Sequence, residues 1–517
     1  MDAATRPLPS SIGWLLLLAL CAAGAMFAVP AEYLGYYWAG LGGLVALVAY
    51  AVFGDLISAV LLWFFTLICL HEEFWRTPVP LFFAVTIPRL GIVVLVVLLV
   101  LMVLAGRVRI NFGGAIGLAI LMTAVYFTLS AAISGFETRS PVTVHYRLIG
   151  GYLFPFTIFG LVLHGFRGEQ HLRRIAAFFL LIGIYLTFTG WAEQFKIWAL
   201  VWPRFIADST VGIHFGRVRG PFVQSAAMGL ALIYCYFNNL ILARQSSGVT
   251  RWLIYAVNVL MLPVIFWTKT RSVWLAFLLC ALLWFAYSRR RTVRAVWVSA
   301  LVTLTALVGI VNMENFLSSQ REKGGFTDVE PILVRLGLAQ ISFNMFTERP
   351  LLGVGFGHFR DHAPMHAQDP SSPFYAFATT AMEHNNFLSI MTETGAVGVA
   401  LYVLMLVLII RPSFQLYRKL PPTAPGFINR DLVVLYWILA LAYLTDGFLR
   451  ETSDNPFANS LFFGLSAAIV ALNNLLGPRP LETYVTEPGA ALSPSPVPVS
   501  PTGPRVRPAE PPRRNLR

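Results

Sequence analysis

The stretch AMEHNNFLSIMTETGAVGVALYVLMLVLIIR, from Ala381 to Arg411, joins a polar cluster to an apolar run long enough to cross a bilayer. The cluster, Glu383-His384-Asn385-Asn386, stands where the predicted helix begins. The N–H groups of a first helical turn have no partners within the helix and carry the positive end of its dipole, so they favour an anionic ligand. Further along, Gly395 and Gly398 allow a neighbouring backbone to approach closely. We therefore place the candidate site at the start of this helix.

The composition places the chain in a lipid bilayer. Of its 517 residues, 57% are hydrophobic and 12% are charged, which is about half the charged share of soluble proteins. Repeated apolar runs of about 17–25 residues predict membrane-spanning helices, and the period-two alternation of β-barrels is not seen. The stretch 36–70 is interrupted only by Gly54-Asp55, so the number of runs is twelve to fourteen. The predicted fold class is an all-α polytopic membrane protein with about 12–14 transmembrane helices.

Basic residues predict the orientation of these helices. Arginines and lysines concentrate in alternate short loops, which the positive-inside bias places in the cytoplasm. The formal net charge of +13 therefore indicates membrane topology rather than nucleic acid binding. The intervening loops face outward. The largest of them, 313–385, leads directly into the polar cluster, and a smaller one covers residues 195–222.

The two ends of the chain and its cysteines add little chemistry. We expect the first apolar run to be an uncleaved helix behind a cytoplasmic N-terminus. Residues 1–476 form the predicted membrane domain, and residues 477–517, rich in Pro, Ser and Arg, are expected to be a disordered cytoplasmic tail. The four cysteines lie in apolar stretches, so neither a disulfide framework nor a zinc site is indicated; they are Cys21, Cys69, Cys235 and Cys280.

Several basic residues lie on the predicted outward side, where the positive-inside bias does not require them. They are Arg217 and Arg219 in HFGRVRGPF, Lys269 and Arg271 in WTKTRSVW, Arg335 in ILVRLGLAQISFNMF, and Arg349 in RPLLGVGFGHF. Guanidinium groups bind phosphate oxygens bidentately, so the set indicates a ligand that carries phosphate. For each residue taken alone, a snorkelling side chain or a contact with a lipid headgroup is the alternative.

His384 also has two interpretations. A histidine at a helix end can cap the helix or pack against it, but imidazole can also take a proton from a hydroxyl near neutral pH. Asn385, Asn386 and the Gly-rich segment upstream favour the second interpretation. Glu393 is either a partner for a charge buried in the membrane or a group that forms a hydrogen bond between helices. The cluster of His358, Asp361, His362 and His366 resembles metal-ligand spacing, but a second strong ligand set is missing and we predict no metal site.

Four segments resemble those of the O-antigen ligase family. His384-Asn385, nine residues and then Gly395-Ala-Val-Gly398 fit the pattern H-[NSQ]-x9-G-x-x-G. The segment RPLLGVGFGHF, with Gly353 and Gly355, is similar to the one that precedes this pattern in the family. RVRGPF and KTRSVW resemble its two outward arginine segments. The four keep their order within residues 190–411, the family-like core.

The resemblance implies a GT-C-like glycosyltransferase of the bacterial inner membrane, active on the periplasmic face and independent of metal ions and other cofactors. Such enzymes transfer a glycan from undecaprenyl diphosphate to an acceptor sugar hydroxyl, here the lipid A–core of lipopolysaccharide, with inversion. His384 would be the general base, and Arg217, Arg219 and Arg271 would hold the diphosphate as it leaves. The resemblance also implies substrate-binding residues and structural glycines. The substrate-binding residues are Lys269, Arg335, Arg349, Asn385, Asn386 and Glu393, and the structural glycines are Gly353, Gly355, Gly395 and Gly398.

Three alternatives stay open at this point. A polymerase of O-antigen or exopolysaccharide in the same superfamily shares donor and fold but has a different acceptor, and the dominance of the loop 313–385 favours the ligase. A protein O-oligosaccharyltransferase would use a Ser or Thr hydroxyl as acceptor. A transporter or flippase predicts ionisable residues at mid-membrane and repeat symmetry. The deep candidates Asp55, Glu393 and Asp446 are scattered and no repeat is seen, so we rank the transporter last.

Overall fold

The structure is a computed structural model that describes residues 55–70, 74, 76–77, 85–110, 114–140, 142–287, 330–367, 385–422, 424 and 426–477. Within these residues, nine helices are long and apolar enough to cross a membrane, and two shorter apolar helices accompany them. The predicted all-α polytopic membrane fold is therefore confirmed. The apolar runs before residue 55 and the one near 295–312 lie outside the described residues, as does the predicted tail after residue 477.

Eleven apolar helices lie in the described part of the chain. They are α3 (Leu56–Cys69), α4 (Ile87–Leu104), α5 (Ala115–Ser134), α7 (Phe154–Gly165), α8 (Glu169–Gln194), α9 (Ser225–Gln245), α10 (Gly248–Trp267), α11 (Arg271–Tyr287), α17 (Asn386–Lys419), α18 (Arg430–Leu449) and α19 (Pro456–Leu475). α6 (Val144–Leu148) and the π-helical turn η3 (Ile149–Leu153) run directly into α7, so the three form one span.

The remaining elements belong to the loops. The loop between α8 and α9 contains three 3-10 turns: η4 (Trp198–Leu200), η5 (Arg204–Ala207) and η6 (Gly220–Phe222). Two helices, α14 (Glu330–Glu348) and α15 (Phe359–His366), precede α17. The strands β1 (Arg76–Thr77) and β2 (Val85–Thr86) pair antiparallel between α3 and α4, with Arg76 opposite Thr86 and Thr77 opposite Val85.

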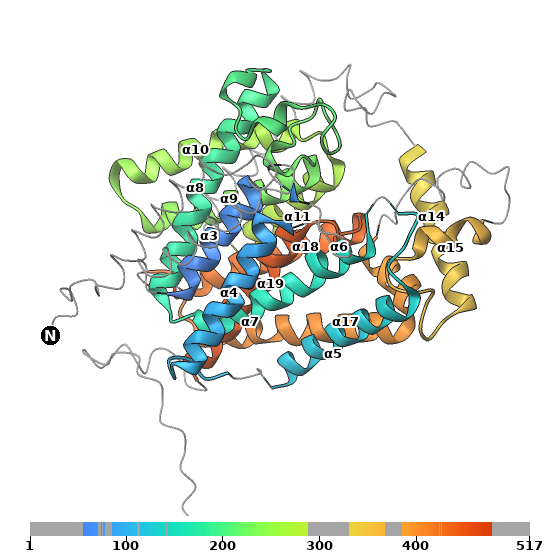
Figure 1. The fold of residues 1–517 in the computed structure, drawn as a ribbon. Coiled ribbons are helices and arrows are strands. Elements are labelled where there is room, and N and C mark those ends of the chain that lie inside the picture. The colour runs from blue at the N-terminus through green and yellow to red at the C-terminus, as the bar shows by residue number, and fades with distance from the viewer. Residues whose placement is uncertain are drawn as a thin grey trace, which may run out of the picture.

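Burial separates the helices at the centre of the bundle from those that face lipid. α9 and α19 are almost entirely buried, whereas less than a third of α4, α5 and α10 is covered by other parts of the protein. A span whose outward side chains stay apolar although exposed is expected where lipid replaces water as the solvent. In Figure 1, α5 and α17 run side by side, and α14 and α15 lie at the end of the bundle where α17 begins.

The two ends of the bundle carry different kinds of charge. At the end where α3 begins, Asp55 caps α3 through the backbone N–H of Ser58 at 2.8 Å and forms an ion pair with Arg174 of α8. At the same end, Arg244 pairs with Asp431, which joins the end of α9 to the start of α18. The opposite end carries the loop between α8 and α9, together with α14 and α15. It corresponds to the outward side predicted from the sequence, and we refer to it as the outward end.

α17 is interrupted at Gly395, whose backbone angles of φ 68° and ψ −169° are not helical. The loop 350–357 docks against this break through backbone hydrogen bonds. The N–H of Ala396 donates to the carbonyl of Pro350 at 2.8 Å, and the N–H of Gly355 donates to the carbonyl of Glu393 at 2.8 Å. The break therefore supplies polar backbone groups that the loop satisfies.

Glycine is required on both sides of this contact. A Cβ atom at Gly395 would overlap the carbonyl of Leu351, and one at Gly353 would overlap the carbonyl of Glu393. Both residues also have positive φ, which side chains of L-residues disfavour. At Gly398, a Cβ atom would meet the side chains of Thr394 and Tyr126. The two glycine segments that the sequence analysis singles out are therefore in direct contact.

Substitution of Gly395 by alanine tests this contact. We expect Gly395→Ala to lower the free energy of unfolding by at least about 1–3 kcal/mol, because positive φ and a backbone overlap both oppose a side chain. Equilibrium unfolding in mixed micelles measures the change. The matched control is Gly160→Ala in α7, where a Cβ atom meets nothing within 4 Å. Equal effects at the two positions would contradict this account of the break.

Candidate active site

Two loop segments that are far apart in the sequence meet at the outward end. α10 ends at Trp267 and α11 begins at Arg271, so the turn between them is very short, and Lys269 adopts a positive φ of 46° in it. The N–H of Val218 donates to the carbonyl of Trp267 at 3.1 Å. Next to it, Nη1 of Arg217 donates to the carbonyl of Lys269 at 3.5 Å. The structure thus brings together Arg217, Lys269 and the first residue of α11.

The charges of this group suit an anion. Arg217, Lys269 and Arg271 are each partly buried, so their charges are incompletely screened by water. Burial lowers the pKa of Lys269, and the nearby positive charge of Arg217 lowers it further. Cations that repel one another are stabilised by a shared anion, and the N-terminus of α11 contributes a positive dipole end at the same place. We call Arg217, Lys269 and Arg271 the cation cluster.

Hydroxyl groups connect the cation cluster to the start of α9. The Oγ of Ser225, the first residue of α9, lies 2.9 Å from Oγ1 of Thr270 and 3.0 Å from Nδ1 of His214. His214 has a positive φ of 63°, which turns the loop back towards α9. These contacts fix the position of the loop 214–225 relative to the turn that carries Lys269.

The side chain of Arg219 does not lie where the predicted contact with the diphosphate would require it. Its side chain is fully buried and turned into the protein, where Nη2 donates to the carbonyls of Ile206 and Asp208 at 3.1 and 2.5 Å. Its backbone N–H donates to Oε2 of Glu193 at 3.0 Å, and its guanidinium lies over the ring of Phe215. Burial lowers the pKa of Arg219, against the effect of Glu193. We therefore assign Arg219 the role of holding the loop 206–211 in place, and we assign anion binding to the cation cluster.

Glu393 belongs to a buried ion-pair network that also contains residues not predicted from the sequence. Arg147 of α6 donates from Nη1 to Oε1 of Glu393 at 2.6 Å and from Nη2 to Oε2 at 2.9 Å. Arg147 also pairs with Glu451 at 3.4 Å, donates to Ser389 at 3.0 Å and donates from Nε to Ser453 at 2.9 Å. These residues join α6, α17 and the loop between α18 and α19 at the outward end.

A general signal in the sequence points to such a partner. An ionisable residue inside a membrane span needs an opposite charge, so Glu393 requires a basic residue on a neighbouring segment. Each of the outward arginines, and also Arg147, carries the positive charge that Glu393 requires. Only the folded structure, in which the side chain of Arg147 reaches Glu393 on α17, shows which of them is used.

The two asparagines at the start of α17 have different contacts. The Oδ1 of Asn385 accepts hydrogen bonds from the N–H groups of Phe387 and Leu388 at 2.9 and 3.1 Å, so Asn385 is the N-cap of the helix. Asn386 is buried. It accepts from the hydroxyl of Tyr152 at 3.3 Å and donates to the hydroxyl of Tyr402 at 3.4 Å. His384, directly before them in the chain, lies outside the described residues.

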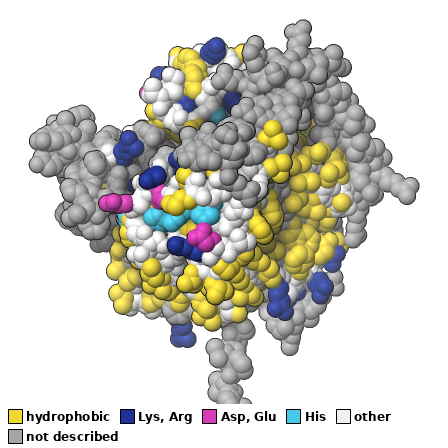
Figure 2. Space-filling model, turned by 90° about the vertical axis from the view of Figure 1, so that its right-hand side faces the viewer, with side chains coloured by type: hydrophobic (Ala, Val, Ile, Leu, Met, Phe, Trp, Pro, Cys, Tyr) yellow, Lys and Arg dark blue, Asp and Glu magenta, His cyan; other side chains and the backbone are white. Residues whose placement is uncertain are grey.

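Arg335 and Arg349 lie in the segment of α14 and α15 that precedes α17, apart from the loops that carry the cation cluster. Both are exposed, Arg335 on α14 and Arg349 just after it. Figure 2 shows histidine, acidic and basic side chains gathered in one patch, with apolar side chains below it and to its right. α14 packs against α15 through apolar residues, among them Leu338, Met345 and Phe359.

The histidines of this region form pairs rather than a cluster. Nδ1 of His358 lies 2.7 Å from Oδ2 of Asp361, and Nε2 of His366 lies 2.6 Å from Oε2 of Glu348. Burial lowers the pKa of His362, and the positive charge of Arg349 lowers it further. In the part of the chain that the structure describes, no three His, Cys, Asp or Glu side chains are grouped so that they could hold a metal ion.

Comparison with known proteins identifies a family over part of the chain. Residues 256–403 match the family model described as O-antigen ligase. The match contains Lys269 and Arg271 of the cation cluster, the docking loop 350–357 and the whole outward part of α17. A search of curated proteins finds no match.

The buried network predicts a large cost for removing its only described arginine. We expect Arg147→Met to lower the free energy of unfolding by about 3–5 kcal/mol, because two buried carboxylates lose their counter-charge. The matched control is Arg173→Met, because Arg173 forms an exposed pair with Glu169 within α8; its loss is expected to cost at most about 1 kcal/mol. Unfolding in mixed micelles compares the two variants. If Arg147→Met lowers the free energy of unfolding no more than the control does, the buried ion pair does not stabilise the fold as described.

Proposed function

Because residues 256–403 match the family model described as O-antigen ligase, we propose that the protein joins a glycan from undecaprenyl diphosphate to a hydroxyl of an acceptor sugar. The superfamily comprises glycosyltransferase-like enzymes of ligase and polymerase type, and the chain is a multi-pass membrane protein. The proposed site faces the periplasm from the inner membrane. The observation that carries this proposal is the meeting of Arg217 with the turn of Lys269 and Arg271 at the outward end.

The cation cluster has the properties needed to bind the diphosphate of the carrier. In the proposed reaction the bond between the anomeric carbon of the glycan and the diphosphate breaks, and its electron pair leaves with the diphosphate oxygen. Positive groups fixed where this charge develops stabilise the transition state more than the ground state. Partial burial strengthens their effect, and the cluster lies at the outward ends of apolar spans, where a lipid headgroup is expected.

The acceptor hydroxyl attacks the anomeric carbon from the side opposite to the diphosphate, so the configuration inverts, and its proton passes to His384 as general base. The contacts of Asn385 support this role indirectly. Asn385 caps α17 and is bonded covalently to His384, and Asn386 and Glu393 anchor the same helix end through Tyr152 and Arg147. We propose that these three residues position the base rather than touch the substrate.

The acceptor distinguishes the two enzyme types. We propose the lipid A–core oligosaccharide, which makes the protein a ligase, with a second carrier-linked repeat unit as the alternative for a polymerase. α14 and α15 lie beside the start of α17, where Arg335 and Arg349 are exposed and are proposed to position the glycan.

A reconstituted assay tests the reaction and its residues. Purified protein is given glycan-loaded carrier and either lipid A–core or a second carrier-linked repeat. A single shift of lipid A–core supports the ligase, and a ladder on the carrier supports the polymerase. We expect Arg217→Ala to lower the rate by about 10²–10³-fold and His384→Ala by about 10²–10⁴-fold.

The matched control for Arg217→Ala is Arg204→Ala, because Arg204 is an exposed arginine of the same loop that contacts the carbonyl of Trp198. Its activity should stay near that of the unchanged protein. Full activity of His384→Ala would exclude His384 as the base, and no transfer to either acceptor would overturn the proposed reaction.

The lowered pKa of Lys269 predicts the pH dependence of carrier binding. Lys269 is charged below its pKa and loses its proton as the pH rises through that value, so affinity for an anion should fall at a lower pH than for an ordinary lysine with a pKa of 10.5. Arginine stays charged throughout this range. We expect undecaprenyl diphosphate to bind more weakly to the unchanged protein as the pH rises from about 7 towards 10.5, and Lys269→Arg to flatten the profile. Identical profiles would show that Lys269 does not contact the diphosphate.

A further inference from the structure

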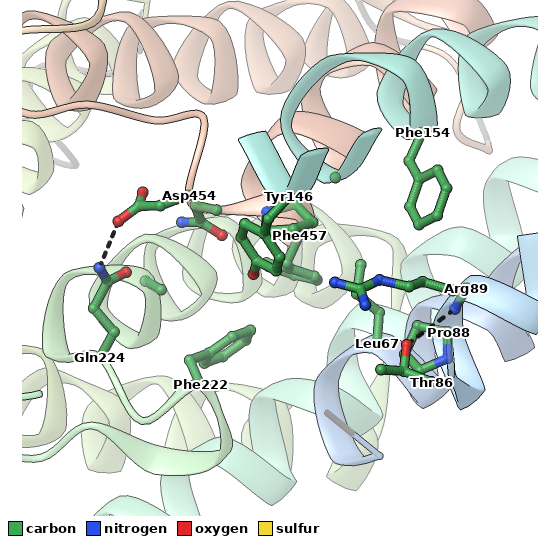
Figure 3. Close-up of a pocket in the computed structure, with 14 residues that line it drawn as sticks. Leu67, Thr86, Pro88, Arg89, Tyr146, Phe154, Phe222, Gln224, Asp454 and Phe457 are labelled. Atoms are coloured by element: carbon green, nitrogen blue, oxygen red, sulfur yellow. Dashed lines mark hydrogen bonds between the residues drawn. The ribbon is translucent and has the colours of Figure 1, made fainter. Parts of the chain in front are cut away.

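A cavity of about 610 Å³, including the part open to solvent, lies at the outward end between α3, α4, α6, η3, α7, η6, α9 and α19. Figure 3 shows Gln224 and Asp454 at one end and Arg89 at the other, with aromatic rings between them. None of the residues that line the cavity is among those predicted from the sequence.

Aromatic side chains form much of the cavity wall. Phe154, Phe222, Phe457 and Tyr146 come from four different elements, and the rings of Phe222 and Phe457 lie 5.0 Å apart. The face of an aromatic ring carries partial negative charge and packs favourably against weakly positive C–H groups. A sugar ring presents such C–H groups on its faces and hydroxyls around its edge. The wall is therefore suited to one face of a sugar.

The polar end of the cavity contains one unsatisfied acceptor and one unsatisfied donor. Oδ2 of Asp454 accepts from Gln224 at 3.3 Å, but Oδ1 of Asp454 has no hydrogen-bond partner among the described residues and is shielded from solvent. Nδ2 of Asn455 is in the same situation, and the side chain of Asn455 is almost entirely buried. Leaving such groups unpaired costs about 1–3 kcal/mol each, and native proteins rarely do so without a reason.

Hydroxyl groups are the ligand chemistry that satisfies both atoms. A hydroxyl can donate to the carboxylate oxygen of Asp454 and accept from the amide of Asn455, and neighbouring hydroxyls of a sugar can serve both residues together. An isoprenoid chain offers neither a donor nor an acceptor. Burial raises the pKa of Asp454, although the positive charge of Arg450 opposes this effect. A hydrogen bond from a sugar hydroxyl would stabilise this buried carboxylate.

The cavity and the cation cluster share one segment of chain. Arg217 stands at the start of this segment, Phe222 and Gln224 line the cavity, and Ser225 contacts Thr270 in the turn of Lys269. A diphosphate held by the cation cluster would therefore place a directly attached sugar next to the cavity. A sugar further along the glycan would not be constrained in this way.

We propose that the cavity binds the sugar unit that is attached directly to the diphosphate of the donor, with Asp454 and Asn455 recognising its hydroxyls. This inference rests on the proposed function and adds to it a specificity site for the donor sugar.

Isosteric substitutions test the sugar site with little change in shape. Asn455→Asp keeps Oδ1, which caps α19 by accepting from the N–H of Ala458 at 3.2 Å, and replaces the unpaired donor by a carboxylate oxygen, with one added negative charge. Asp454→Asn keeps an oxygen for Gln224 and exchanges the unpaired acceptor for a donor. Asn429→Asp is the matched control, because Asn429 caps α18 at the other end of the bundle. Thermal unfolding checks that all three variants fold.

Binding is measured with two probes: carrier-linked glycan purified from membranes that make it, and undecaprenyl diphosphate alone. We expect Asn455→Asp and Asp454→Asn to weaken binding of the glycosylated carrier about tenfold or more and to leave binding of the bare carrier unchanged. The control should alter neither.

Three results would overturn the inference, and they differ in what else they affect. Equal weakening with both probes would assign the cavity to the lipid or the diphosphate, and no weakening with either would show that the cavity does not contact the donor. Both results leave the proposed function standing. If the unchanged protein binds neither probe, the proposed function fails and the sugar site fails with it.

Discussion

The ion pair between Arg147 and Glu393 holds together the outward end on which every other feature of the site depends. Both side chains are buried, and moving one charge out of water costs several kcal/mol unless an opposite charge and further hydrogen bonds compensate. Glu451, Ser389 and Ser453 supply the further contacts. The start of α17, the span that begins with α6, and the loop after α18 are therefore fixed relative to one another, and the cap of α17 is fixed with them.

The break at Gly395 extends this rigid region to the loop and helices before α17. Residues 350–357 bond to the backbone of α17 on both sides of the break, and the apolar faces of α14 and α15 pack against each other behind them. The carbonyl of Glu393 accepts from Gly355 while its carboxylate pairs with Arg147. One residue thus connects the loop to the interior of the bundle. The glycines are needed because two backbones cannot approach this closely past a side chain.

The spans could be predicted from the sequence because each must be apolar over the thickness of a bilayer, whatever its neighbours are. The sequence predicts that Arg217 and Lys269 lie on the same side of the membrane, since both segments adjoin spans at their outward ends. It does not predict that the two residues are in contact. The inward turn of Arg219 could not be predicted either. In an extended chain, residues two apart share a face, but this segment is not an extended strand: Arg219 has φ −122° and ψ −16°, and Gly216 and Gly220, which flank the two arginines, have positive φ.

The partner of Glu393 was beyond prediction for a related reason. It lies 246 residues away in the sequence, and local patterns carry no information on which of several basic residues a folded chain will bring close. Asp454 and Asn455 were overlooked because they look like loop residues of a short connection. Their unsatisfied atoms become visible only when the neighbours that fail to contact them are in place.

The arginines of the outward end divide into two groups by their surroundings. Arg147 and Arg219 are buried and contact carboxylates or carbonyls of the protein, so they hold segments of the chain together. Arg217 and Arg271 are partly exposed and stand beside Lys269, whose pKa is lowered by burial and by the charge of Arg217. The charge of Arg217 lowers the pKa of Lys269, which shows that these two cations repel each other. An anionic ligand would relieve this repulsion, which is the physical reason to place the diphosphate there and its sugar in the adjoining cavity.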